Sequence, residues 1–302
     1  MIKLLSPLLA AWLLCAGPAF AWNKAGHMTT GAIAYRELKK SDPAALAKVL
    51  ALLRAHPQYD RYFKETESMP GEDGEMMLFM LAARWADDIR GQPAYTHDVW
   101  HYIDYPYRPP SAATKKPDGE NIVDALESNR TLVKTSTDQQ ARAVALCWVM
   151  HLTGDIHQPL HATEMYRADF PKGDRGGTAF YIMPPEGGTL SLHQLWDGMI
   201  IGSERFQAVR NTATELANRP EYARAKFTTD LAETSAEKWA RNESFPLAIK
   251  YAYRNGDLGG GGSKSNGIPL PADYLAQAKP VAERQMVLAG YRLAESLRTL
   301  VK

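Results

Sequence analysis

The chain has 302 residues, of which 35 are basic and 34 acidic, so its formal net charge is +1. A chain this close to neutrality does not attract polyanions through its overall field, so a nucleic acid would have to be held by local charge at a site. Two cysteines, Cys15 and Cys147, exclude a disulfide-rich scaffold, and the length is sufficient for a large hydrophobic core.

The first 21 residues have the pattern of an export signal. Lys3 precedes an apolar run over residues 4–14 that is too short to span a bilayer, and Ala-Phe-Ala follows at 19–21. We therefore expect cleavage before Trp22, giving a periplasmic or secreted protein with no stable membrane association. An uncleaved N-terminal anchor is the alternative, and a lipoprotein anchored at Cys15 is disfavoured by the bulky leucine before it.

The N-terminus created by this cleavage could bind a metal ion. A free α-amine and the carbonyl oxygen of the same residue can close a five-membered chelate on a metal. Trp22 would supply both groups, and His27, five residues further on, could add a third ligand. Metal binding would then depend on where the precursor is cut.

Apolar residues recur at helical spacing along most of the chain. The predicted helices lie within residues 46–53, 77–85, 122–133, 141–154, 206–218, 228–242 and 281–300. Strand-like alternation is scarce, and its best candidate is a hairpin that pairs 177–183 with 189–192. Segments 105–120 and 255–271, rich in proline or glycine, are predicted loops. We expect a mainly α fold, with one compact helical domain over residues 22–302 and at most a short β-hairpin.

Residues 151–161 concentrate groups that bind metals. His151 and Asp155 are four residues apart, so a helix places both side chains on one face. Pro159 disfavours a helical conformation at the residue before it, so the helix should end near Gln158. His161 should then lie just beyond the end of the helix.

The same spacing occurs again in His193 and Asp197, and Asp87 and His101 are further candidates. Imidazole and carboxylate ligands without thiolate suit zinc in a catalytic role, where coordination positions stay open to water or substrate. A single histidine of this kind is more often structural, but two such pairs together favour a metal site.

With these residues in this order, the chain resembles the S1/P1-type zinc nucleases, which prefer single strands. The resemblance implies an α-helical fold related to zinc-dependent phospholipase C, with three zinc ions in a cleft. The first zinc would be held by Asp87, His101, His151 and Asp155. The second would be held by His161, His193 and Asp197. The third would be held by the amine and carbonyl of Trp22, by His27 and by a second oxygen of Asp155.

The resemblance also implies the reaction. The protein would be an endonuclease that hydrolyses phosphodiester bonds of RNA and single-stranded DNA to 5′-phosphate products, with 3′-nucleotidase activity, acting as a monomer. Asp87 and Asp155 would take part in catalysis, and Arg90 matches the arginine of that family that contacts phosphate.

Three positions correspond to substrate contacts of that family. Tyr102 matches an aromatic residue that stacks on a base, and Asp104 matches an acid that hydrogen-bonds the base. Thr178 stands where the family usually has asparagine, which puts the positioning of the substrate in doubt more than the binding of metal.

Two other functions remain open at this point. A phospholipase C would share the fold and the three-zinc site, and Tyr102 could equally line a choline site. A non-catalytic zinc-binding protein is disfavoured by Arg90 and by a ligand set that leaves coordination positions open.

Overall fold

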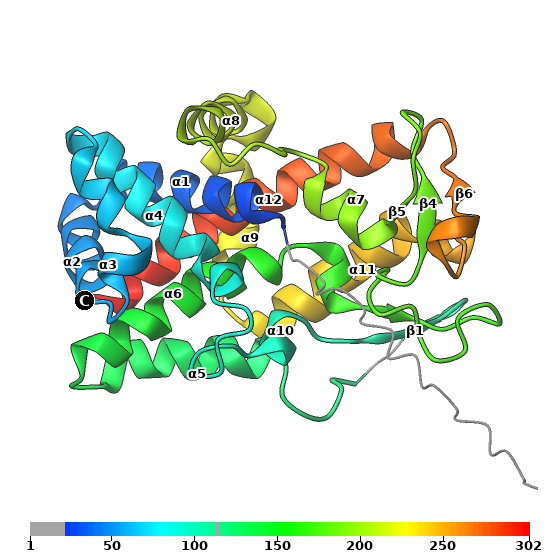
Figure 1. The fold of residues 1–302 in the computed structure, drawn as a ribbon, viewed down its shortest axis with the longest axis horizontal. Helices are drawn as coiled ribbons and strands as arrows, with labels where there is room; N and C mark the ends of the chain where they lie inside the picture. The colour runs from blue at the N-terminus through cyan, green and yellow to red at the C-terminus, as the bar shows by residue number, and fades with distance from the viewer. Residues whose placement is uncertain (1–21, 113–114) are drawn as a thin grey trace, which may run out of the picture.

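The computed structural model describes residues 22–112 and 115–302, and the predicted export signal lies outside them (Figure 1). The described chain is mainly helical. Its longer helices are α1 (Lys24–Ser41), α2 (Pro43–Arg54), α4 (Gly71–Asp88), α5 (Ile122–Thr135), α6 (Gln139–Asp155), α8 (Phe206–Asn218) and α12 (Tyr274–Leu300). Its shorter helices are α3 (Tyr59–Tyr62), α7 (Leu192–Gly198), α9 (Thr228–Ala232), α10 (Ala236–Lys238) and α11 (Phe245–Leu247).

Helix α1 lies in the middle of the helical layer, against α4, α12 and α8 (Figure 1). Its residues 25–35 are all buried, so the helix has no exposed face over three turns. Gly31 permits the close contact with α4, because a methyl group there would lie 2.7 Å from the carbonyl oxygen of Phe79. On α12, Gly290 does the same, since a methyl group there would lie 2.5 Å from Ile33 Cγ2. Small residues thus bring three helices together around the segment that carries His27.

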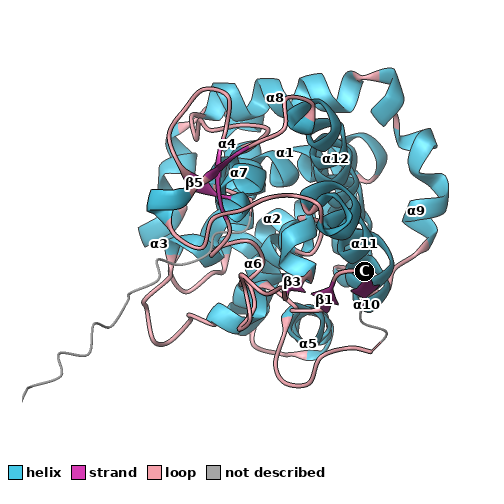
Figure 2. Cartoon of the chain, turned by 90° about the vertical axis from the view of Figure 1, so that its right-hand side faces the viewer, coloured by secondary structure: helices cyan, strands magenta, loops and turns pink. Residues whose placement is uncertain are grey.

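Six very short strands lie at the end of the molecule remote from the C-terminus (Figures 1 and 2). Strand β1 (Pro106–Arg108) pairs with β2 (Ser111–Ala112) and, in parallel, with β3 (Glu164–Met165). Strand β4 (Tyr181–Met183) pairs with β5 (Leu190–Ser191) and, in parallel, with β6 (Ile268–Pro269). The first sheet matters for the site, because it sets the segment after His101 beside the segment after His161.

The predicted fold class is confirmed. The hairpin expected between 177–183 and 189–192 is present as β4 and β5, with Tyr181 opposite Ser191. The remaining strands went unpredicted because two or three residues are too few to show alternation. The helix predicted over 228–242 is interrupted: α9 ends at Ala232, and α10 leads into a π-helix, η6 (Trp239–Ser244).

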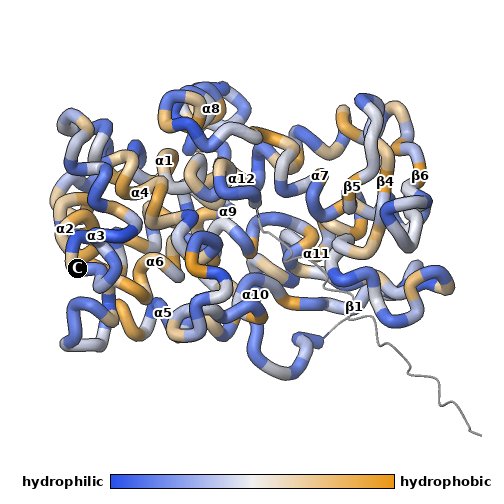
Figure 3. Tube along the Cα trace, in the orientation of Figure 1, coloured by the Kyte–Doolittle hydropathy of each residue, from blue (hydrophilic) through white to orange (hydrophobic). Residues whose placement is uncertain are grey.

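Hydrophobic and hydrophilic residues are interspersed along the long helices (Figure 3). Within the part of the chain that the structure describes, no helix combines the length and apolarity needed to cross a membrane. The apolar residues pack instead into one core cluster that includes Trp22, Trp85 and Trp196. Cys147 is buried in α6, and burial raises the pKa of its thiol.

Candidate metal centre

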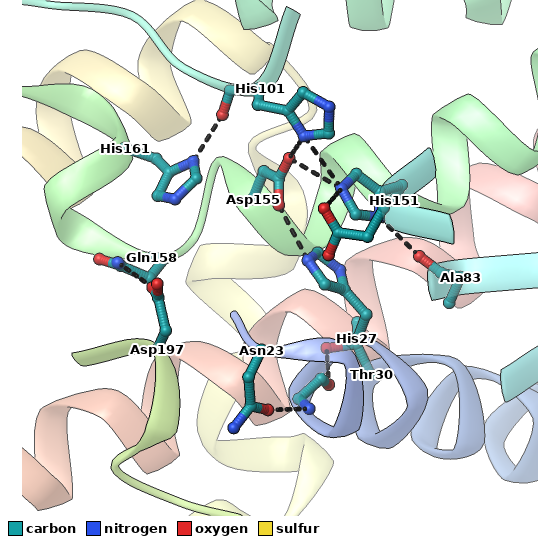
Figure 4. A network of polar contacts seen from close by, with 12 residues as sticks. Asn23, His27, Thr30, Ala83, His101, His151, Asp155, Gln158, His161 and Asp197 are labelled. Atoms are coloured by element: carbon teal, nitrogen blue, oxygen red, sulfur yellow. Dashed lines mark hydrogen bonds and ion pairs between the residues drawn. The ribbon is translucent and has the colours of Figure 1, made fainter. Parts of the chain in front are cut away.

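Eight predicted ligand side chains converge from six separate elements onto one buried region. Figure 4 labels His27, His101, His151, Asp155, His161 and Asp197 among them. Helix α1 carries His27, α4 carries Asp87, and α6 carries His151 and Asp155. The 3-10 helix η2 (Asp98–His101) ends with His101, and η3 (Pro159–Ala162) contains His161. Helix α7 carries His193 and Asp197. Segments far apart in the sequence therefore deliver their nitrogen and oxygen donors to the same place.

Asp155 lies between the imidazoles of three histidines. Its Oδ2 is 2.9 Å from His101 Nδ1 and 3.2 Å from His151 Nε2, and its Oδ1 is 3.0 Å from His27 Nε2. Although His27 Nε2 and Asp155 Oδ1 are close, neither makes a hydrogen bond of acceptable geometry within the described structure. Both oxygens of one carboxylate thus face nitrogen donors on opposite sides, as the predicted bridge between two ions requires.

Asp87 completes the first group beside His101 and His151. Its Oδ1 is 4.0 Å from His151 Nε2 and accepts a hydrogen bond of 2.9 Å from Arg90 Nε. Its Oδ2 is buried and makes no hydrogen bond to any described residue. Arg90 lies just beyond the end of α4 rather than on the helix, and its side chain is 14% exposed.

His161, His193 and Asp197 form a separate group. His161 Nδ1 is hydrogen-bonded to the carbonyl of His101, and His193 Nδ1 is hydrogen-bonded at 2.6 Å to the carbonyl of Gly176. A carbonyl only accepts, so each Nδ1 carries the proton and each Nε2 carries a lone pair. The two Nε2 atoms lie 3.1 Å apart, and two lone pairs at that distance repel unless a cation lies between them.

Gln158 fixes the carboxylate of this second group. Its amide donates a hydrogen bond of 2.7 Å to Asp197 Oδ1, while its own oxygen accepts from the backbone N–H of Leu160. Asp197 Oδ2 is buried, lies 3.6 Å from His193 Nε2 and has no hydrogen-bond partner within the described structure. Burial raises the pKa of Asp197 well above its usual range, so the charged form needs a cation at this oxygen.

The electrostatics around Asp155 also suit a cation. Burial opposes the charge of Asp155, but His151, His27 and the hydrogen bonds from His101 and His151 hold its pKa well below the usual range. Burial lowers the pKa of His27 and lowers that of His101 to about 4, which favours neutral rings with lone pairs. Against its burial, the carboxylates of Asp155 and Asp87 instead raise the pKa of His151, so a metal ion bound there would take the place of its proton. Imidazoles beside a charged carboxylate are a donor set that zinc prefers. The residues therefore fit a metal centre.

Trp22 is buried beside this centre. Asn23 caps α1 by accepting a hydrogen bond of 2.8 Å from the Gly26 N–H, and its own N–H donates to the carbonyl of Asp197. These bonds hold the start of the described chain between α1 and α7. A methyl group on Gly154 would lie 2.8 Å from His27 Nδ1 and 3.9 Å from Trp22 Cδ1, so both side chains border the helix that carries Asp155.

The three predicted substrate contacts line one pocket of about 110 Å³ beside the second group. Its walls are formed by Tyr102, Asp104, Leu160, His161, Glu164, Arg175, Gly176, Thr178 and His193. Burial and then the negative charges of Glu164 and Asp174 raise the pKa of Asp104 to about 7, against an opposing effect of Arg175. Two candidate metal ligands, His161 and His193, line this pocket. It can therefore bind one part of a substrate while the metal ions bind another part.

Comparison with known proteins agrees with this geometry. The family described as S1/P1 nuclease matches residues 22–302. The chain belongs to the S1/P1 nuclease family. Endonuclease 4 of Arabidopsis thaliana is 27% identical, over 93% of this chain and 90% of its own length. Nuclease S1 of Aspergillus oryzae is 24% identical, over 96% of this chain and 95% of its own length. Membership of this metal-dependent family supports a hydrolase with endonuclease activity and a nucleic acid as substrate.

Four residues that shape the S1/P1 site were not predicted from the sequence. Gln158 orients Asp197, and Gly176 supplies the carbonyl that orients His193. Glu164 and Arg175 enter the pocket through the pairing of β3 with β1 and through a turn with positive φ at Arg175, Gly176 and Gly177. The two adjacent glycines were the one local signal for that turn.

The three histidines outside the predicted ligand set belong to none of the metal-binding groups found among the described residues. His56 packs edge-on against Trp85, and His97 stacks on Trp100 at 3.7 Å between ring centroids. His157 Nδ1 is hydrogen-bonded to the carbonyl of Thr153, and its Nε2 faces a guanidinium nitrogen of Arg292 at 2.9 Å.

Proposed function

We propose that the protein is an exported, zinc-dependent endonuclease that hydrolyses RNA and single-stranded DNA to 5′-phosphate products and also acts as a 3′-nucleotidase. The observation that carries the proposal is the convergence of eight buried histidine and aspartate side chains in three adjoining groups beside a polar pocket of about 110 Å³. Membership of the S1/P1 family supports the same reaction class.

Three zinc ions would be held by the residues assigned above, with Trp22 contributing once cleavage has freed its amine. When bound, the ions supply the positive charge that a neutral chain lacks and act as Lewis acids toward the phosphodiester and water. The buried, partly unpaired carboxylate oxygens of Asp87, Asp155 and Asp197 are the best support for cations at these positions.

The chain's own groups then orient the substrate. Arg90 is held through its Nε by Asp87, so its guanidinium is fixed at the edge of the first group, where it can donate paired hydrogen bonds to phosphoryl oxygens. Tyr102 lines the neighbouring pocket, where its ring can stack on a base that has left a helix. A base must be unpaired to enter such a pocket, which favours single strands over duplexes.

Thr178 replaces the asparagine expected at its position and lies in the same pocket. Its hydroxyl is buried and makes no hydrogen bond to any described residue, so a substrate group that reached it would supply the partner it lacks. One hydroxyl offers fewer hydrogen bonds than an amide, and Glu164 and Arg175 line the wall beside it.

The test uses the processed protein, beginning at Trp22, on single-stranded DNA, RNA and 3′-AMP. We expect cleavage that is lost with a chelator and restored by zinc, with 5′-phosphate ends on the products. Protein that holds three zinc ions and cleaves none of these substrates would remove the proposal. Faster hydrolysis of phosphatidylcholine than of any nucleotide would identify a phospholipase C instead.

A further inference from the structure

The pocket beside His161 and His193 contains more polar groups than stacking and one hydrogen-bonding acid require. Two carboxyl groups, Asp104 and Glu164, and one guanidinium, Arg175, line the same small volume. That volume is about 110 Å³, which leaves room for one small planar group and no more. We propose that the pocket selects guanine, and that Glu164 and Arg175 are the residues that determine this specificity.

Glu164 is held in place before any substrate arrives. The hydroxyl of Tyr166 donates to its Oε2, and the guanidinium of Arg108 covers the ring of Tyr166 at 4.1 Å. Gly173, with φ of +88°, packs on the same carboxylate, because a methyl group there would lie 2.1 Å from Glu164 Oε1. The carboxylate is therefore fixed in one orientation, and a preorganised acceptor discriminates better than a mobile one.

The first sheet sets Glu164 next to Asp104. Glu164 is the register partner of Pro106, and its N–H donates to the carbonyl of Tyr105 at 3.1 Å. Asp104 is therefore two residues before Pro106, the residue opposite Glu164. Parallel pairing brings two acids together that are 60 positions apart in the sequence.

Arg175 lies in a turn that the hydrogen bonds of the preceding residue, Asp174, hold in place. Asp174 accepts hydrogen bonds from the Met165 N–H at 2.9 Å and from the Tyr253 hydroxyl at 2.7 Å. Arg175 itself has φ of +55°, a conformation that residues other than glycine seldom adopt and that surrounding structure must impose. The anchored turn holds Arg175 and Thr178 at the pocket wall.

Guanine is the base whose edge matches these groups. It presents two adjacent donors, N1–H and the exocyclic N2–H, beside the acceptor O6. The carboxylates of Asp104 and Glu164 accept from the two donors, and Arg175 donates to O6. Adenine and cytosine each offer one amino donor beside a ring acceptor, and uracil has two acceptors around one donor, so each leaves a polar group of the pocket without its partner.

This inference rests on the proposed function, so its test separates the two. The processed, zinc-loaded protein is assayed on 3′-GMP, 3′-IMP, 3′-AMP and 3′-UMP. A matched bidentate contact predicts kcat/KM for 3′-GMP about tenfold to a hundredfold above that for 3′-AMP. Inosine lacks only the N2 amino group, so 3′-IMP should fall between them. Equal values for all four nucleotides would overturn the inference and leave the nuclease proposal standing.

Two variants locate the determinants. Glu164→Gln should lower kcat/KM for 3′-GMP toward the value for 3′-AMP, chiefly through KM, because an amide cannot accept at both atoms. Arg175→Gly suits the positive φ and so keeps the turn while removing the guanidinium, and it should reduce the same ratio. The matched control is Glu221→Gln, at an exposed glutamate of the short helix η4 (Pro220–Tyr222) outside the pocket. An unchanged ratio in both pocket variants would overturn the assignment.

A binding measurement decides the inference even if no nucleotide is hydrolysed. Calorimetry on the zinc-loaded protein with 5′-GMP and 5′-AMP should show about tenfold tighter binding of 5′-GMP, lost in Glu164→Gln. Equal affinities would overturn the inference. If the protein bound guanine selectively but hydrolysed none of the substrates, the nuclease proposal would be wrong and the inference about the pocket would stand.

Discussion

The substitution Gly154→Ala should favour helix α6 and, at the same time, displace a side chain of the metal centre. Gly154 lies within α6, where alanine is favoured over glycine by about 1 kcal/mol. The added methyl group, however, would lie 2.8 Å from Nδ1 and 3.1 Å from Cε1 of His27. Relaxed contacts are about 3.5 Å, so the imidazole must move by roughly 0.7 Å.

This movement of the His27 ring would change its contact with Asp155. His27 Nε2 is 3.0 Å from Asp155 Oδ1, and both side chains are fully buried, so the ring has no empty space to move into. Overpacking of this kind costs about 1–3 kcal/mol, which leaves a net loss of at most about 2 kcal/mol after the gain in helix propensity. A misplacement approaching 1 Å can lower a reaction rate about a hundredfold.

The expected result is therefore a folded protein with a damaged third site. Zinc content should fall from three ions to two, and cleavage of single-stranded DNA should fall by about a hundredfold. The control is Gly198→Ala at the end of α7, where the new methyl group meets only Asn23 Nδ2 at 3.8 Å. If Gly154→Ala keeps full zinc content and rate, His27 is not a metal ligand and the reasoning fails.

Three further predictions concern the terminus, the bridge and the pocket. One residue added before Trp22 should lower zinc content and activity, because an amide nitrogen is a poor zinc ligand; a fully active extended variant would contradict the chelate. Asp155→Asn should be the most damaging single substitution, since it disturbs two ions, and elemental analysis should show more than one zinc lost. The KM for 3′-GMP should fall as pH rises through about 7, because Asp104 becomes charged there and accepts hydrogen bonds better. Glu164→Gln removes a negative charge that raises the pKa of Asp104, so in this variant KM should fall at a lower pH. An inflection that stays in place would refute the coupling.

The sequence indicated which side chains cluster here, because they lie in recognisable local patterns. The two histidine–aspartate pairs at helical spacing and the break at Pro159 are visible without any tertiary information. Helix α6 ends at Asp155, and His161 follows in η3, as the proline required.

The residues that the sequence did not reveal depend on tertiary contacts. Helix α1 has no exposed face over residues 25–35, because other helices surround it, so hydrophobic periodicity could not identify it. Glu164 enters the pocket only because β3 pairs in parallel with β1, and Gln158 acts on a carboxylate 39 positions away. Neither relation leaves a local signal.

The most direct test of the central claim is the zinc content of the processed protein, measured alongside cleavage of single-stranded DNA. Three zinc ions per chain are expected, with activity that disappears as chelator removes them and returns when zinc is added. A protein that cleaves at its full rate with no bound metal would contradict the role assigned to these eight side chains.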